Sequence, residues 1–132
     1  MRASGKRVCY YSYPVELVWR SIGAGENRTV DPLTEEEFEN QEPEPNTIFT
    51  RMLEFEENRV FAFRMKARGF VTDMRIELES TGPCETRVTL RQDVEYLNAA
   101  IWFFSGFGSS IRRELRSFAL EINRRLADGI KK

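Results

Sequence analysis

Residues 70–96 read FVTDMRIELESTGPCETRVTLRQDVEY, and this stretch decides the fold. Apolar side chains recur at the even positions of residues 70–79 and again of residues 86–96, which is the period of half-buried strands. The intervening residues 80–83 (Ser-Thr-Gly-Pro) favour a turn. Because so short a connection can join only antiparallel neighbours, the sequence predicts a β-hairpin with one apolar face.

The charges on these two strands predict their register. The apolar faces match only if the numbers of paired residues add to an even sum. A sum of 164 places Asp73 opposite Arg91. A sum of 166 opposes like charges at two positions, Asp73 with Asp93 and Arg75 with Arg91. Since directly opposed like charges destabilise a sheet, we predict the register of 164.

That register places two polar side chains, Thr72 and Gln92, opposite each other on the apolar face. An unsatisfied buried polar group costs about 1–3 kcal/mol, so both need a hydrogen-bond partner. One hypothesis is that they orient a ligand in a mostly apolar pocket. The alternative is that they bond each other or a buried water.

Two more runs of period two, residues 47–55 and 59–67, precede the hairpin. Turn-forming residues separate all four runs, so we expect an antiparallel meander. Upstream, residues 7–13 are rich in β-forming side chains. Pro14 then favours the start of a short amphipathic helix, residues 15–22, which ends at glycine.

Two further segments differ from this pattern. Residues 26–46 hold eight acidic residues and one basic residue, and we expect a mobile acidic loop with at most one or two helical turns near 35–40 or a short strand near 28–30. Residues 109–128 have helical spacing, with one apolar stripe formed by Ile111, Leu115, Phe118, Ala119, Ile122 and Leu126. The stretch 101–108 before this helix is rich in aromatic residues.

Composition bounds the function. The 132 residues, 41% of them hydrophobic and 16 aromatic, fit one domain, 1–132, with a core of its own. Twenty basic and 21 acidic residues give no overall attraction to nucleic acid. The chain contains no histidine, which excludes histidine-based triads, and its two cysteines have no metal-site or redox spacing, so we expect no metal and no cofactor. No stretch is apolar enough for stable membrane insertion, and a cytoplasmic location is the default expectation.

The order of these segments resembles the START-like, Bet v 1-like helix-grip superfamily, and in particular its polyketide cyclase/dehydrase-like branch. The resemblance rests on the strand-to-helix entry 11–19, the runs 69–74 and 79–83, the strand 86–90 and the tail helix. It implies an α+β fold in which a curved antiparallel sheet wraps around a long C-terminal helix. The family usually has six or seven strands, and the acidic segment 26–46 departs from that pattern.

The resemblance also implies a function, because members of this superfamily bind lipids, sterols, aromatic polyketides or other apolar small molecules. The expected partner is therefore an apolar small molecule held between the sheet and the C-terminal helix. The candidate ligand-binding residues are Phe61, Phe63, Met65, Thr72, Met74, Ile76, Gln92, Val94, Phe118 and Ile122, with Trp102, Phe103 and Phe107 near the mouth.

Two other functions remain open at this point. Related cyclases and dehydratases are enzymes, and the candidate catalytic residues for such a reaction are Tyr11, Tyr96, Arg64 and Glu54. The third hypothesis is a protein-interaction module resembling chaperone regulators, which would use the acidic loop or the aromatic stretch. The arginines of the tail helix are interpreted as solvated side chains, and the sequence predicts no oligomeric state.

Overall fold

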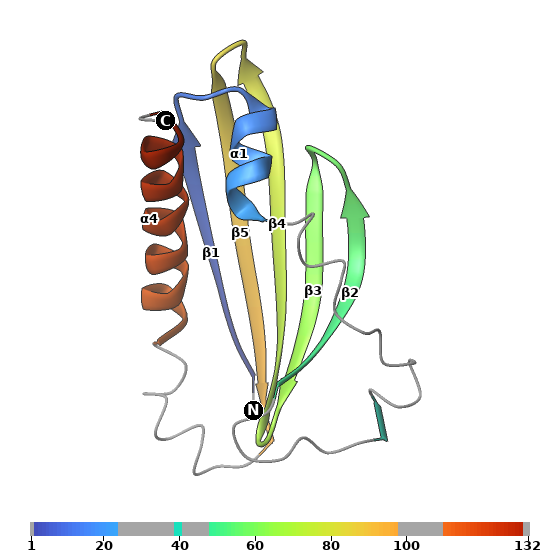
Figure 1. Ribbon diagram of the computed structural model, residues 1–132. Helices are drawn as coiled ribbons and strands as arrows, with labels where there is room; N and C mark the ends of the chain where they lie inside the picture. Colours follow the sequence, from blue (N-terminus) through green and yellow to red (C-terminus); the bar gives the residue numbers. More distant parts are fainter. Residues whose placement is uncertain (1, 24–38, 41–47, 98–109, 131–132) are drawn as a thin grey trace.

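The structure is a computed structural model that describes residues 2–23, 39–40, 48–97 and 110–130. Its principal elements follow the order β1 (Arg2–Tyr11), α1 (Val15–Ile22), β2 (Ile48–Glu56), β3 (Val60–Ala67), β4 (Phe70–Gly82), β5 (Glu85–Tyr96) and α4 (Ser110–Ile130). The five strands form one antiparallel sheet in the order β1-β5-β4-β3-β2 (Figure 1). The expected α+β helix-grip fold, with a long C-terminal helix on the sheet, is therefore confirmed.

Both helices pack on one face of the sheet, which we call the inner face (Figure 1). α1 covers parts of β4 and β5, whereas α4 packs mainly along β1, at the edge of the sheet, and also reaches β5 and α1. Among the described residues, no helix has both the length and the apolar character needed to span a membrane.

A glycine explains why α4 lies so close to β1. Gly5 occupies an inner-face position of β1, and a Cβ atom there would lie 2.6 Å from Cγ2 of Ile111 and 3.2 Å from Cδ1 of Leu115. Only a residue without a side chain fits such an approach. The buried stripe of α4 can therefore pack directly against the backbone of β1.

The boundaries of α1 follow from its terminal residues. Pro14 precedes the first turn, and its carbonyl oxygen accepts hydrogen bonds from the N–H groups of Leu17 and Val18. The helix ends at Gly23, which adopts the left-handed conformation with φ 74°. This matches the predicted helix of residues 15–22. The preceding corner is held by Thr86, whose hydroxyl donates to the carbonyl oxygen of Tyr13 at 2.8 Å.

The predicted apolar face of the hairpin is the inner face of the sheet. The even positions 72–78 of β4 and 86–96 of β5 are buried, and the odd positions between them are more exposed. The buried residues on these strands are Thr72, Met74, Ile76, Leu78, Thr86, Val88, Leu90, Gln92, Val94 and Tyr96. The apolar stripe of α4 is buried as predicted, at Ile111, Leu115, Ala119, Ile122 and Leu126, while Phe118 is half-buried.

The predicted register of this hairpin is wrong. Paired residues of β4 and β5 add to 166 rather than 164, so Asp73 lies opposite Asp93 and Arg75 lies opposite Arg91. As a consequence, Thr72 pairs with Val94 rather than with Gln92, which lies opposite Met74.

Neighbouring charges explain why the sheet tolerates this register. On β3, Arg64 forms a bidentate ion pair with Asp73, with Nε–Oδ1 at 2.6 Å and Nη2–Oδ2 at 3.0 Å. Arg75 pairs with Glu54 of β2 at 2.6 Å and with Glu77 of its own strand at 3.2 Å. Asp73 therefore has a cation directly opposite it on β3, and Arg75 has a carboxylate on β2 as well as one on its own strand. The two strands of the hairpin, taken alone, include neither β2 nor β3.

The first strand is longer than predicted, and the structure describes the acidic segment only in part. β1 begins at Arg2, five residues before the predicted strand of residues 7–13, because β5 supplies hydrogen-bond partners along its whole length. Of the predicted acidic loop 26–46, only residues 39–40 are described, and they are helical. The rest of that prediction lies outside the described residues.

Candidate ligand-binding face

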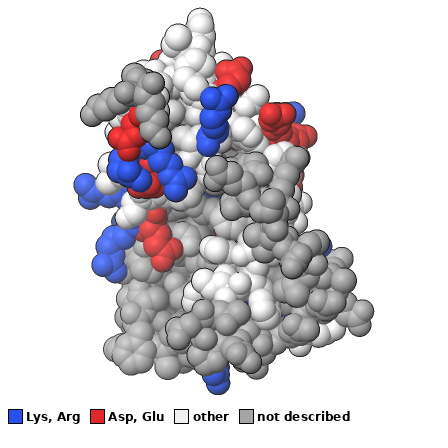
Figure 2. Space-filling model, viewed as in Figure 1, with Lys and Arg blue, Asp and Glu red and all other residues white. Residues whose placement is uncertain are grey.

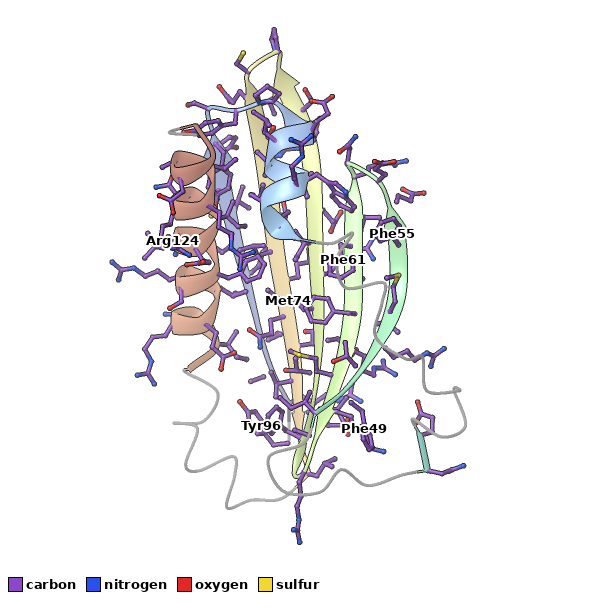
Figure 3. All side chains as sticks on the ribbon, in the orientation of Figure 1. Phe49, Phe55, Phe61, Met74, Tyr96 and Arg124 are labelled. Atoms are coloured by element: carbon purple, nitrogen blue, oxygen red, sulfur yellow. The ribbon has the colours of Figure 1, made fainter. Side chains whose placement is uncertain are left out.

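A row of aromatic side chains crosses the inner face on the side of β2 and β3. Trp19 of α1 meets Phe55 of β2 edge-on, with ring centroids 5.5 Å apart. Phe55 meets Phe61 at 6.2 Å, and Phe61 meets Phe63 at 5.2 Å. In Figure 3, Phe55, Phe61 and Met74 follow one another from the edge of the sheet toward its middle. This part of the inner face is therefore a continuous aromatic and thioether surface.

The inner face of β4 and β5 also carries polar side chains. Thr72 and Gln92 are 3% and 7% exposed, so both are buried within the core. Nε2 of Gln92 donates a hydrogen bond of 2.8 Å to Oε2 of Glu114 on α4. Tyr96 lies farther along β5 and is also buried (Figure 3). A contact between an amide and a carboxylate thus joins the sheet to the helix at this end.

A shallow groove follows α4 beside this contact. The described residues that line it are Arg113, Glu114, Ser117, Phe118 and Glu121. Arg124 and Arg125 both donate hydrogen bonds to Glu121, and the bond from Arg124 is the main reason that the pKa of Glu121 falls to about 2. Figure 2 views this side of the molecule, and the charged side chains visible there gather mainly over α4. The groove therefore has a charged rim with one half-buried ring, Phe118, in its wall.

Most of the predicted ligand-binding residues share this face. Those on the sheet are Phe61, Phe63 and Met65 of β3, Thr72, Met74 and Ile76 of β4, and Gln92 and Val94 of β5. Ile122 is buried on the sheet side of α4, and Phe118 lines the groove. The three residues predicted at the mouth, Trp102, Phe103 and Phe107, lie outside the described residues.

The four candidate catalytic residues are divided between the two faces of the sheet. Tyr11 and Tyr96 are buried on the inner face. Arg64 and Glu54 lie on the outer face, where Arg64 pairs with Asp73 and Glu54 pairs with Arg75. The fold therefore does not bring the four residues together.

Tyr11 has a structural contact of its own. Its hydroxyl donates a hydrogen bond of 2.8 Å to the backbone carbonyl oxygen of Ala119 in α4. Burial, followed by the nearby Cys9, raises the pKa of Tyr11 above its ordinary value of 10.0. The phenol therefore ties β1 to α4 in its neutral, protonated form.

Sequence reasoning did not assign three residues of this face. Phe55 belongs to a period-two run, but a β-bulge between Met52 and Glu54 shifts which side of β2 faces inward. Trp19 belongs to the predicted amphipathic helix of residues 15–22, which the sequence does not link to the site. Glu114 lies beside the apolar stripe of α4. The one signal for it in the sequence is that the buried amide of Gln92 needs a hydrogen-bond partner.

The outer face offers a different chemistry. Two grooves lie there, and their linings include Lys6, Glu54, Arg75, Glu77 and Arg91 in one and Arg64, Lys66, Asp73, Asp93 and Glu95 in the other. In the described ranges, no group of three or more cysteine, aspartate or glutamate side chains could hold a metal ion. The apolar side of the sheet is therefore its inner face.

The fold and this one-sided apolar face define the chain as a helix-grip α+β protein. No family model matches the sequence, and no curated protein matches it either. The fold itself has close structural counterparts. The di-domain aromatase/cyclase BexL of the BE-7585A biosynthetic pathway superimposes with a TM-score of 0.67 and 12% identity, over 95% of this chain and 46% of BexL.

Two other solved structures share the fold along nearly their whole length. Ara h 8.0201 superimposes with a TM-score of 0.64 and 6% identity, over 97% of this chain and 99% of that one. Norcoclaurine synthase from Thalictrum flavum, in complex with dopamine and hydroxybenzaldehyde, gives 0.62 and 7% identity, over 97% and 88% of the two chains. These solved structures share the fold of this chain, which bears out the helix-grip fold that the resemblance implies.

Proposed function

We propose that this protein binds an apolar small molecule on the inner face, between the sheet and α4. The observation that supports this function best is the aromatic and thioether surface of β3 and β4. Phe63 and Met65 are only half-buried, although they face the same side as the buried Phe61 and Met74. Apolar side chains with a few polar groups beside them are typical of small-molecule sites.

The proposal is one of binding rather than catalysis. Two of the four candidate catalytic groups, Arg64 and Glu54, lie across the sheet from this surface in ion pairs. Support from outside the chain comes from norcoclaurine synthase, which has the same fold and holds two small aromatic molecules in its structure.

A thermal-shift screen with fatty acids, sterols, quinones and flat aromatic compounds tests this function. A ligand present at 100 times its dissociation constant stabilises a fold by about 2.7 kcal/mol, which raises the melting midpoint of a domain of this size by several degrees. Phe63→Ala should weaken the response to any compound that binds. Val71→Ala, on the outer face of β4, is the matched control and should not. The absence of a shift in every class, or an equal loss in both variants, would contradict the proposal.

A further inference from the structure

The contact between Gln92 and Glu114 has a defined polarity. A carboxylate has no hydrogen to donate, so the amide nitrogen of Gln92 must be the group that faces Glu114. Gln92 is 7% exposed, whereas the side chain of Glu114 is exposed and lines the groove along α4. The contact therefore connects the buried inner face to a surface that solvent and solutes can reach.

The remaining hydrogen-bonding positions of this pair are mostly acceptors. Glu114 keeps a second carboxylate oxygen, and Gln92 keeps its carbonyl oxygen and a single amide hydrogen. In the described part of the chain, no fully buried side-chain nitrogen or oxygen lacks a partner, so the protein does not need a ligand to complete this contact. A molecule that arrives here is therefore bound best if it donates hydrogen bonds.

The charges along α4 also favour a ligand that donates hydrogen bonds. Glu121, on the same side of the helix, is neutralised by ion pairs with Arg124 and Arg125 at 2.5 and 3.2 Å. Within the described part of the chain, Glu114 contacts the neutral amide of Gln92 and forms no ion pair, so its negative charge is not cancelled in that way. Arg113 also lines the groove and is the cation that a ligand carboxylate would use.

We propose that Glu114 and Gln92 bind the polar group of the ligand, and that this group is a hydrogen-bond donor, best a protonated amine, on an otherwise apolar aromatic molecule. Met74 lies directly opposite Gln92 in the register, and Met65 and Phe63 follow on β3, so the apolar part has a surface beside the polar contact. This inference rests on the proposed function and adds the class of ligand to it.

Three compounds that differ only in their polar group test the proposal: naphthylethylamine, naphthylethanol and naphthylacetate. Isothermal titration calorimetry with the intact chain should rank the affinities as amine, then alcohol, then acid. Glu114→Gln keeps an acceptor for Gln92 but removes the charge, and it should weaken amine binding by at least about tenfold while changing the affinity for the alcohol little. Asp128→Asn removes a carboxylate elsewhere on α4 and should leave all three affinities unchanged.

The outcomes separate this inference from the function on which it rests. If none of the three compounds binds while another class binds in the thermal-shift screen, the proposed function stands and the amine assignment is overturned. Tightest binding of naphthylacetate would assign the polar contact to Arg113 and overturn the proposal. Equal affinities for the amine in Glu114→Gln and in the unchanged protein would also overturn the proposal. A melting midpoint measured in parallel establishes that the variant is folded.

Discussion

Single residues determine how closely the two layers of this molecule approach. Gly5 lets Ile111 reach the backbone of β1, and the hydroxyl of Tyr11 binds the backbone of α4 at Ala119. Both contacts lie on β1, the strand on which α4 mainly packs. The position of the helix therefore depends on a few side chains of one edge strand.

Gly5→Ala should destabilise the fold by about 1–3 kcal/mol, because its methyl group would overlap Ile111. Urea unfolding measures the change. Gly82→Ala is the control, since a Cβ there meets only Glu85 Cβ at 3.9 Å, an ordinary contact. Adding Ile111→Ala to Gly5→Ala should cost less than the sum of the two single changes. Strict additivity would show that the contact does not limit the approach of the helix.

Tyr11→Phe should remove the part of the pH dependence of stability that comes from the phenol of Tyr11. Burial raises the pKa of Tyr11 in the folded state, so the neutral phenol contributes stability that is complete below its unfolded value of 10.0 and is lost as pH rises above it. The free energy of unfolding of the unchanged protein should therefore fall more steeply above pH 10 than that of the variant. Parallel curves on both sides of this pH would contradict the assignment.

At the scale of elements, the third strand decides the pairing of the hairpin. Asp73 can lie opposite Asp93 because Arg64 of β3 neutralises it. The same two strands considered alone predict the other register, which is where the sequence-based argument failed. Charge pairs along one strand and across two neighbours must be weighed together before a register can be inferred.

Removing the two partners of this ion pair should have unequal effects. Arg64→Met leaves Asp73 facing Asp93 without a cation and should destabilise the protein, whereas Asp73→Asn also relieves the repulsion and should cost less. The coupling energy in a double-mutant cycle should be at most about 1 kcal/mol, because both side chains are partly exposed. Arg59→Met, which removes an exposed pair with Glu56, is the control and should change stability little. A larger loss for Asp73→Asn than for Arg64→Met would contradict the explanation.

The elements differ in how much of them could be predicted. Period-two and helical spacing located the meander strands and both helices to within a few residues, and they assigned the buried face of β4 and β5. The start of β1 could not be predicted, since Ala3 and Gly5 favour a strand only because β5 and α4 lie beside them. Phe55 and Glu114 were missed for a related reason: a bulge and a contact between distant elements decide their positions.

At the scale of the whole molecule, the sheet separates two chemistries. The outer face carries a network of ion pairs. The inner face carries the aromatic row, the two helices and the contact between Gln92 and Glu114. An apolar ligand bound on the inner face would contact methionines, which makes its position measurable. Met65 and Met74 lie on the inner face of the two central strands, and Met52, which is opposite Phe63 on the edge strand β2, is 38% exposed.

The most direct test of the binding proposal is a titration of methyl-¹³C-methionine-labelled protein with naphthylethanol, followed by NMR, with each signal assigned by a Met→Leu variant. We expect the Met65 and Met74 methyl signals to move together along one saturable curve. Saturable binding of naphthylethanol that moves neither the Met65 nor the Met74 signal would contradict binding on the inner face between the sheet and α4.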